Sequence, residues 1–294
     1  MKILNFLICS VLFTVGFITH GKTQNALIVV DAQKGFAEEQ KLVIEGIEGE
    51  QVHGLVVDEA EKIIEPINSL ITGLAQEQEG LTLVYSGDFH PTDHLGFFQM
   101  HEEGTCDIGK PMKVPDHSKE SQQWPFHCVQ GTSGCDFITG LKVPASVTDN
   151  LAIGFVQKGT RPGIESYSCL VDEDGLENTI ASSFQDATQE KTYTSVNLDG
   201  SPVEARTSTM DYLAANVDFE RTSRVIVTGL ALDVCVKKTA ESLHNKLKAR
   251  GLSDNVEIIV PLDGTKHAID KQETISELKK LGIKFVDRAE DLLP

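Results

Sequence analysis

The chain has 294 residues, with 26 lysines and arginines against 44 aspartates and glutamates, so its formal net charge is −18. This acidic balance repels phosphate backbones and anionic membrane surfaces, which excludes nucleic acid as an expected partner. Six cysteines are too few for a disulfide-built scaffold, and 40% hydrophobic residues exclude a disordered chain. The composition predicts an acidic globular protein that is long enough to bury a substantial core.

The N-terminus is an apolar stretch with one positive residue. Lys2 precedes residues 3–19, which are almost all apolar, and small residues follow. This pattern predicts a secretory signal peptide over residues 1–21. We therefore expect residues 22–294 to be exported, to an extracellular, periplasmic or lumenal compartment, without stable membrane association. The alternative is an uncleaved membrane anchor, but the run is shorter than the ~20 residues that span a bilayer comfortably.

Short apolar β-rich runs alternate with helical patterns along the rest of the chain. In chain order, they predict strand 26–30, helix 57–75, strands 81–85 and 152–157, helix 210–215, strand 224–228, helix 234–249, strand 256–260, helix 271–280 and strand 283–286. Several strand runs are continuously apolar, as expected for strands buried on both faces. We expect one α/β domain with an open, mostly parallel sheet of about six strands and helices on both faces. Polar stretches near 45–61 and 172–208 are predicted to be insertions.

Polar residues follow four of these strands, at the edge where open α/β sheets bind ligands. Asp31 follows the first strand, Asp88 and His90 the second, Lys158 the third and Cys235 the fourth. A cysteine in the first turn of a helix is favoured as a thiolate, and a nearby lysine adds to this effect. Asp31 is placed to accept the thiol proton as the sulfur attacks. This convergence predicts a cysteine nucleophile. A buried cysteine, a capping aspartate and a surface lysine are the alternative interpretation.

Asp88 and His90 also offer a carboxylate and an imidazole donor two residues apart. Together with His94 and His127, they predict a site for Zn²⁺ or Fe²⁺ that leaves positions open for water or substrate. Taken alone, the Asp-x-His pair is more typical of a hydrogen-bonded turn. The chain has no G-x-G-x-x-G, P-loop or G-x-S-x-G motif, so dinucleotide binding, P-loop chemistry and a serine nucleophile lack support.

Five blocks in the same order resemble the nicotinamidase/pyrazinamidase branch of the isochorismatase-like cysteine hydrolases. They are D-x-Q-x-x-F from Asp31, D-x-H-P-x-x-H from Asp88, W-P-x-H-C-V-x-G-T from Trp124, K-G with a following S-Y-S from Lys158, and G-x-A-x-D-x-C-V-x-x-T-A from Gly229. Isochorismatases and carbamoyl-sarcosine amidases share the Asp, Lys and Cys pattern or part of it. They typically lack the metal block, which therefore separates the branches.

The resemblance implies a role for each matched residue. Cys235 is the expected nucleophile, Asp31 the general acid/base, and Lys158 the residue that holds both in their charged arrangement. Backbone N–H groups of Ala231 and Cys235 are the expected oxyanion hole, next to a cis peptide between Leu230 and Ala231. The implied metal ligands are Asp88, His90 and His127, with His94 as an accessory ligand. The implied pocket residues are Phe36, Trp124 and Leu230.

The resemblance also implies the reaction. Nicotinamide, or a similar small amide such as pyrazinamide, would be hydrolysed to its acid and ammonia through a thioester on Cys235. One divalent metal would assist, with zinc expected before iron or manganese. A related hydrolase of another small amide and a secreted protein that binds the ring without turnover are the alternatives. A homo-oligomer is compatible with the sequence.

Three features depart from the family pattern. Leu170 stands where relatives usually have phenylalanine, and Val234 where they often have tyrosine or histidine. The insertion after Leu170 is unusually long and could form a lid, bend the pocket or lie on the surface.

In an oxidising compartment, Cys106 is expected to pair with Cys128 or Cys135.

Overall fold

The computed structural model of the chain describes residues 21–43, 50–78, 80–101, 106–113, 120–144, 151–186 and 190–294. Residues 1–20 of the predicted signal peptide therefore lie outside the described residues. In the part of the chain that is described, no helix combines the length and apolar character needed to cross a bilayer.

The six predicted strands are all present in one eight-stranded sheet. They are β1 (Asn25–Val30), β4 (Leu81–Asp88), β7 (Leu151–Lys158), β11 (Ser223–Leu230), β12 (Val256–Pro261) and β14 (Lys284–Val286). Two further strands, β8 (Ile180–Ala181) and β13 (Thr265–Lys266), are too short for sequence periodicity to reveal. The order is β14-β12-β11-β1-β4-β7-β8, with β13 beside β11. Within this sheet, only the pairing of β7 with β8 is antiparallel, so the predicted open and mostly parallel sheet is confirmed.

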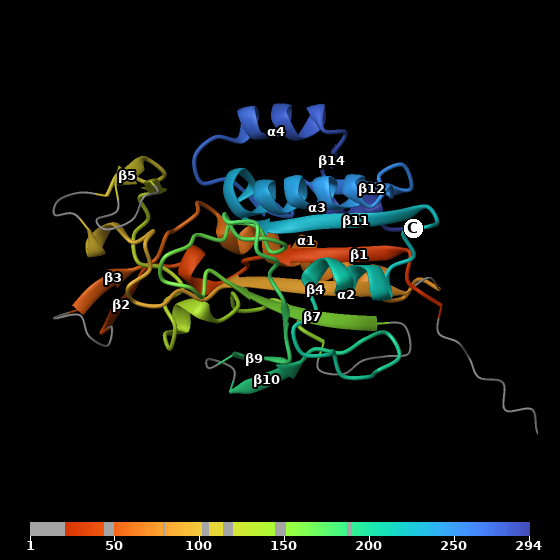
Figure 1. Cartoon of the computed structure of the whole chain (residues 1–294), viewed down its shortest axis with the longest axis horizontal. Coiled ribbons are helices and arrows are strands. Elements are labelled where there is room, and N and C mark those ends of the chain that lie inside the picture. The colour runs from red at the N-terminus through yellow and green to blue at the C-terminus, as the bar shows by residue number, and fades with distance from the viewer. Residues whose placement is uncertain are drawn as a thin grey trace, which may run out of the picture.

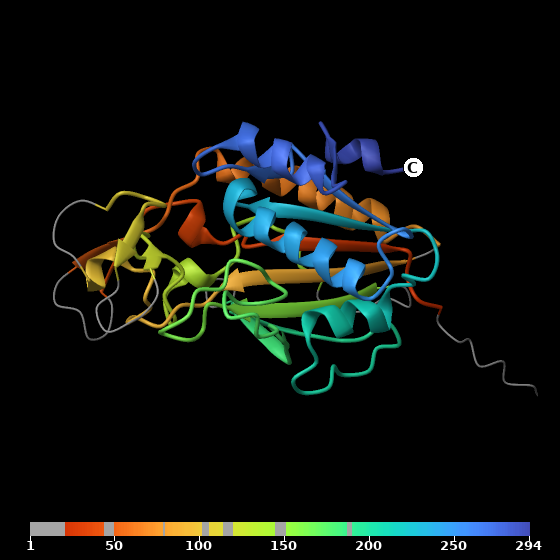
Figure 2. The ribbon, with the colours of Figure 1, turned by 45° about the horizontal axis from the view of Figure 1, so that its top comes forward.

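The central strand β1 is apolar on both sides because helices cover both faces of the sheet. Leu27 and Val29 pack in one buried cluster with helix α1 (Ile64–Leu74). Ala26 and Ile28 point to the opposite face, as alternate residues of a strand must. There they share a second cluster with helices α2 (Thr209–Asn216) and α3 (Lys237–Ala249). Figure 1 shows α2 and α3 in front of the sheet, and Figure 2 shows α4 (Lys271–Lys280) above α3.

Two helices begin later than the sequence pattern predicts. The predicted helix 57–75 is α-helical only from Ile64, because Glu59 is left-handed at φ 56° and a 3₁₀ turn, Ala60–Ile63, intervenes. The predicted helix 234–249 starts at Lys237, after a π-helical turn at Leu232–Val236. Such π turns occur frequently at functional sites. The other two helices match their predicted ranges to within one residue.

The two predicted insertions have different positions. The first, near 45–61, contains β3 (Glu50–His53), which pairs with β2 (Gln40–Val43) just before the predicted range. The second carries β8 and the hairpin of β9 (Ser183–Asp186) and β10 (Lys191–Thr194). The β9 ring of Phe184 stacks on Phe155 of β7, with ring centroids 5.7 Å apart. Strand β8 of the same insertion pairs with β7 at Phe155 and Val156 and so covers part of the backbone that an edge strand would otherwise expose.

A third hairpin, β5 (Pro111–Lys113) with β6 (Glu120–Gln122), lies among the loops beyond the strand ends. The carboxyl ends of β1, β4, β7 and β11 point toward the side of the molecule that carries β2, β3 and β5 (Figure 1). Because the strands are parallel, the residues that follow them meet along one edge of the sheet.

Candidate active site

Lys158 lies at the centre of a buried group of charges at this edge. Its side chain is completely buried, and its Nζ is 2.8 Å from Asp31 Oδ2. The same ammonium donates to Asp88 Oδ1 and to the Ser166 carbonyl oxygen, the latter at 3.1 Å. It is also 3.4 Å from Cys235 Sγ. The structure therefore brings together the three residues predicted to carry the chemistry.

Asp31 is held in place from both its backbone and its side chain. Its φ is 47°, in the left-handed region that residues other than glycine rarely adopt. Its backbone N–H donates to Ser86 O at 3.0 Å, and Ser86 Oγ donates to Asp31 Oδ1 at 2.8 Å. Asp31 Oδ2 remains directed at Lys158, and its carboxylate lies in one group with Cys235 Sγ, all ligand atoms within 4.8 Å of one another. Ser86, which was not among the predicted site residues, fixes this geometry.

The protonation states of the three residues follow from burial and mutual attraction. Burial raises the pKa of Asp31 to about 6, against the opposing effect of Lys158. Burial opposes the charged form of Lys158, but Asp31 and Asp88 outweigh it and hold its pKa well above the ordinary value. At neutral pH the pair is therefore an ionised carboxylate and an ammonium.

The expected resting thiolate of Cys235 is not favoured by this structure. Burial raises the pKa of the thiol well above its ordinary value, and Lys158 offsets this only in part. The sequence argument relied on a helix N-terminus, but α3 begins two residues after Cys235, and the cysteine lies in the π-helical turn. A thiol with a carboxylate beside it is suited to lose its proton during attack rather than before it.

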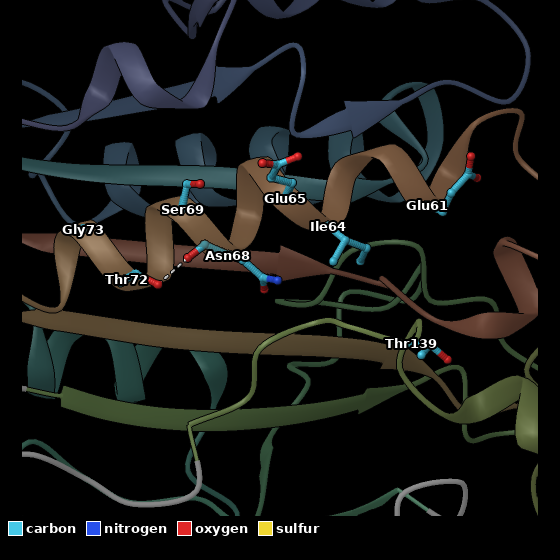
Figure 3. A pocket seen from close by; sticks show the side chains of 8 residues that line it. All are labelled: Glu61, Ile64, Glu65, Asn68, Ser69, Thr72, Gly73 and Thr139. Atoms are coloured by element: carbon cyan, nitrogen blue, oxygen red, sulfur yellow. Dashed lines mark hydrogen bonds between the residues drawn. The ribbon is translucent and has the colours of Figure 1, made fainter.

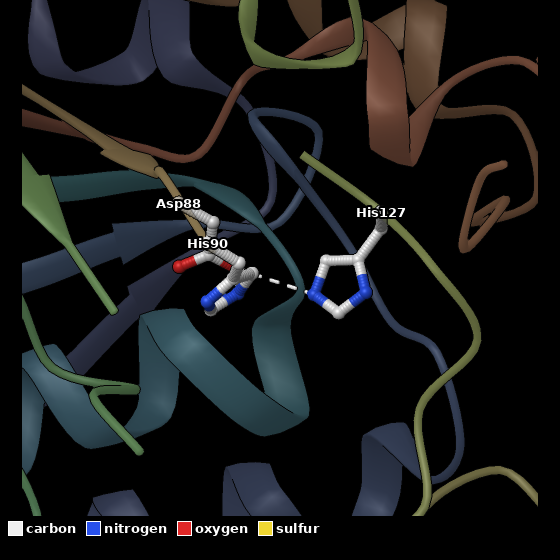
Figure 4. A group of neighbouring side chains, drawn as sticks. All are labelled: Asp88, His90 and His127. Carbon is white, nitrogen blue, oxygen red and sulfur yellow. Dashed lines mark ion pairs between the residues drawn. The ribbon is translucent and has the colours of Figure 1, made fainter. Parts of the chain in front are cut away.

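Asp88, His90 and His127 form a group of donors with all ligand atoms within 4.8 Å of one another (Figure 4). Asp88 Oδ2 is 3.4 Å from His90 Nε2 and 3.6 Å from His127 Nε2. His90 Nδ1 is 3.0 Å from Gly159 O, and His127 Nδ1 is 2.7 Å from Pro125 O. A carbonyl oxygen only accepts, so these contacts place the proton on Nδ1 and leave each Nε2 lone pair directed at Asp88.

This donor set fits a divalent metal. Two imidazoles held by backbone carbonyls and one carboxylate are the ligands of open zinc sites, which keep a further position free. Burial lowers the pKa of His90 to about 4, so the ring is neutral at pH 7, as a ligand must be. Position 159 must be glycine, because a Cβ there would lie 2.3 Å from His90 Cε1.

His94 lies beside this group, with its ring centroid 4.2 Å from that of His90. Its Nε2 is 3.2 Å from Ile164 O, and its Nδ1 accepts from the Gly96 N–H at 3.2 Å. Both ring nitrogens therefore contact the backbone. His94 also belongs to a neighbouring group of possible ligands with His90 and Glu165. Its predicted accessory role stays a prediction.

A cavity opens directly onto Cys235, Asp88 and His127. Phe36 and Trp124 line it, as predicted, and Ala231 lies beside Cys235 in its wall. The peptide between Leu230 and Ala231 is cis, as the resemblance implies. The oxyanion hole at Ala231 and Cys235 remains a prediction. The lining is completed by residues that were not predicted to face the pocket: Leu55, Val57, Glu165, Tyr167, Val234 and Ala268.

Leu230 differs from its predicted place. It is fully buried in the hydrophobic core and does not line the cavity, because it is the last residue of β11 and its side chain joins the core cluster of α1. Tyr167 takes part in the wall instead, and its hydroxyl accepts a hydrogen bond from Trp124 Nε1 at 3.0 Å. The S-Y-S block was the available signal for Tyr167. Leu55 and Val57 had no such signal, because they were assigned to an insertion and a helix.

Leu170 is buried in the core and absent from the cavity wall, so this departure from the family pattern leaves the cavity unaltered. Val234 does line the cavity.

The predicted pairing of Cys106 with Cys128 or Cys135 is wrong in this structure, since all five cysteines of the described residues are free thiols. Cys106 packs with Leu95, Phe98 and Met112, whereas the other two lie in the main core.

Two other hollows lie outside the catalytic group. One lies along the outer side of α1, between Glu61 and Gly73, and none of the predicted site residues lines it (Figure 3). The other adjoins the catalytic cavity and shares Glu165, Tyr167 and Val234 with it. The second hollow thus extends the cavity toward solvent, while the first has no connection with the chemistry.

Sequence comparisons relate the chain to known enzymes. No protein-family model matches it. It is 25% identical to the nicotinamidase of Schizosaccharomyces pombe over 217 residues, which are 73% of this chain and 74% of that protein. It is also 25% identical to the nicotinamidase of Saccharomyces cerevisiae over 270 residues, which are 89% of this chain and 99% of that protein.

Solved structures share the fold. The yeast nicotinamidase Pnc1p bound to the inhibitor nicotinaldehyde matches with a TM-score of 0.59 at 23% identity, covering 90% of this chain and 100% of that one. The pyrazinamidase of Pyrococcus horikoshii in complex with zinc matches with a TM-score of 0.50 at 24% identity, covering 90% and 98%. Similarity over most of the chain and a shared fold therefore confirm its resemblance to the nicotinamidase/pyrazinamidase branch of the isochorismatase-like cysteine hydrolases.

Proposed function

We propose that the protein is an amidohydrolase that converts nicotinamide and water into nicotinic acid and ammonia through a thioester on Cys235. The observation that carries this proposal is the position of Lys158. Its ammonium contacts Asp31, Asp88 and Cys235 at the inner end of a cavity. A nucleophile, a base and a metal-binding carboxylate thus contact one buried cation, and the base lies beside the nucleophile that it must activate.

The first half of the reaction forms the thioester. Cys235 Sγ attacks the amide carbonyl carbon while Asp31 accepts the thiol proton. The tetrahedral oxyanion is stabilised by the backbone N–H groups of Ala231 and Cys235, and one such donor contributes about 3 kcal/mol in other enzymes. The carbon–nitrogen bond then breaks, and Asp31 returns its proton to the departing ammonia. Lys158 stays protonated throughout and keeps Asp31 directed at the sulfur.

The second half releases the acid. Asp31, again ionised, accepts a proton from a water molecule that attacks the thioester carbonyl. The carbon–sulfur bond breaks, the thiol of Cys235 regains a proton through Asp31, and nicotinic acid leaves. Because burial raises the pKa of Asp31 to about 6, this carboxyl both accepts and returns protons readily near neutral pH.

Asp88, His90 and His127 would hold one divalent metal, and we propose zinc. When bound, the metal supplies a Lewis acid that orients the ring nitrogen of the substrate. Zinc agrees with the imidazole-rich donor set, and the related pyrazinamidase of P. horikoshii is known in complex with zinc. Iron and manganese are compatible with the same ligands.

The cavity suits a small flat aromatic amide. Phe36, Trp124 and Tyr167 form aromatic walls around the nucleophile, while Leu55 and Val57 close the apolar side. Flat apolar walls with few polar groups are typical of sites that bind small aromatic rings. The related yeast enzyme binds nicotinaldehyde, which has the ring of nicotinamide.

Ammonia release by the purified protein tests this function. We expect turnover of nicotinamide and of pyrazinamide, and none of isochorismate. Turnover of isochorismate, or binding of nicotinamide without ammonia release, would reject the proposal. Assays with other small aromatic amides identify the substrate if only nicotinamide fails.

We also propose that residues 1–21 direct export and are then removed. The support is the sequence pattern of one positive residue followed by an apolar run. Mass spectrometry of the protein from a secreting host should find a chain that begins near residue 22. An intact N-terminus on a protein retained in the cell would contradict it.

A further inference from the structure

Gln33 is completely enclosed next to the catalytic group, and no step of the proposed reaction uses it. Its side chain is 1% exposed. The Asp88 N–H donates to Gln33 Oε1 at 2.8 Å, and Gln33 Nε2 donates back to Asp88 O at 3.0 Å. The second N–H of the amide has a partner as well, Cys135 O at 2.9 Å. One amide therefore pairs with both backbone groups of Asp88, as a residue of a neighbouring strand would.

The position of this pairing explains why the backbone groups of Asp88 need a side chain as their partner. Strands β1 and β4 are paired up to Val30 and Ser86. Beyond that point β1 has ended, while β4 continues to Asp88 and still pairs with β7 on its other side. The β1 side of Asp88 would then have no ladder partner. The Gln33 amide takes this place and completes the backbone hydrogen bonds of Asp88 at the end of the strand.

Gly87 makes room for the amide. A Cβ on Gly87 would lie 2.8 Å from Gln33 Nε2, closer than real Cβ contacts occur, and 3.0 Å from its Cδ, which is also tight. The space that a side chain at position 87 would fill is thus occupied by Gln33. Gln33 of the first motif block and Gly87, just before the metal block, therefore depend on each other.

We infer that Gln33 is a positioning residue that holds the backbone of Asp88 so that its carboxylate meets both Lys158 and the metal-binding histidines. Asp88 Oδ1 accepts from Lys158, while Oδ2 faces His90 and His127. A small rotation of the Asp88 backbone would break one of these two sets of contacts. The inference rests on the proposed metal site and hydrolysis, and it assigns to Gln33 no contact with substrate.

Two substitutions test it by different routes. Gln33→Glu keeps the acceptor for the Asp88 N–H and removes both donors. Gly87→Ala leaves Gln33 intact but displaces its amide, so it serves if the buried glutamate prevents folding. The probe is Co²⁺ alone, titrated into the metal-free full chain and followed by its absorption spectrum. Partners that orient metal ligands typically cost 10–100-fold in metal affinity when altered, and we expect a loss of about this size for both variants.

Matched controls separate positioning from general damage. Asn216 is a buried amide at the opposite end of the sheet that accepts from Leu198 N and donates to Tyr212 O. Gly154 lies in β7, where a Cβ would be 2.9 Å from the Tyr212 ring. Asn216→Asp and Gly154→Ala should lower the unfolding temperature much as the test variants do, yet bind Co²⁺ as the wild type does.

Equal Co²⁺ affinity in Gln33→Glu, Gly87→Ala and wild type would overturn the inference. An equal loss in the control variants, or no Co²⁺ binding by the wild type, would overturn it too. If the expected pattern of Co²⁺ binding is found but the wild type releases no ammonia from nicotinamide, the proposed function fails and the role of Gln33 stands.

Discussion

Lys158 and Asp88 form a buried ion pair that joins the nucleophile to the metal-binding residues. The Asp88 carboxylate faces Lys158 with one oxygen and the two histidines with the other. Lys158 in turn contacts Asp31 and Cys235. Changes in either half of the site are therefore transmitted to the other through a single carboxylate.

Removal of the nucleophile should abolish turnover without unfolding the chain. Cys235→Ala removes only the sulfur, and we expect ammonia release to fall by at least about 10³-fold, since a covalent nucleophile cannot be replaced by its neighbours. Ammonia release and circular dichroism check both parts. Cys106→Ala is the matched control and should retain full activity, because Cys106 lies in a separate apolar cluster. An active Cys235→Ala enzyme would exclude the thioester.

Lys158→Met should be costly for stability as well as for activity. It removes the only described ammonium between Asp31 and Asp88, and breaking a buried ion pair in this way costs about 3–5 kcal/mol of unfolding free energy. Urea denaturation measures the loss. Lys284→Met breaks an exposed pair with Glu257 and should change stability little. Similar losses of unfolding free energy in the two variants would show that the buried ion pairs of Lys158 do not stabilise the fold.

The acid limb of the pH profile should lie near pH 6. The pKa of Asp31 rises from 3.8 to about 6 on burial, so below about pH 6 the carboxyl is protonated and cannot accept the thiol proton. We expect kcat/KM to fall about tenfold per pH unit below this value. Steady-state assays at several pH values, with circular dichroism to show that the fold persists, measure it. An acid limb near pH 4 would mean that Asp31 titrates like an exposed aspartate.

Loss of a histidine ligand should remove the metal and the activity together. His127→Ala leaves two donors of the group, so we expect the metal content to drop well below one ion per chain and turnover to fall with it. Inductively coupled plasma mass spectrometry and ammonia release provide the two readouts. His244→Ala, on α3, should retain both. Chelation of the wild type should reproduce the loss, and added Zn²⁺ should reverse it. Full activity without metal would reject the metal assignment.

The hydrogen bond between Trp124 and Tyr167 should affect substrate binding. Tyr167→Phe removes the acceptor of Trp124 Nε1, and a hydrogen bond of about 1 kcal/mol corresponds to a roughly fivefold rise in KM. Tyr212→Phe removes a similar bond, to Val196 O, far from the cavity. That control should lower stability and leave KM unchanged. Equal KM values in the two variants would mean that Tyr167 does not orient the wall.

The sequence by itself determined the order of strands along the chain and the residues that end them. Apolar runs of five or six residues are visible because both faces of a parallel sheet are buried, and ligand-binding residues in such sheets follow the strands. Asp31, Asp88, Lys158 and Cys235 could be selected for this reason before any distance was known. The metal ligands could be selected because Asp88 and His90 belong to a block that resembles a family motif, whereas the Asp-x-His spacing alone is more typical of a turn.

Only the tertiary structure decided which residues lie in contact and how deeply each is buried. Burial depends on the surroundings of a residue, so the raised pKa of Cys235 was not accessible from its place beside a helix. Leu230, predicted to line the pocket, lies in the core, whereas Leu55, from a predicted insertion, lines the cavity; facing a cavity or the core depends on the packing of distant segments. The pairing of Gln33 with Asp88 joins residues 55 positions apart and exists only where two strands end at different heights.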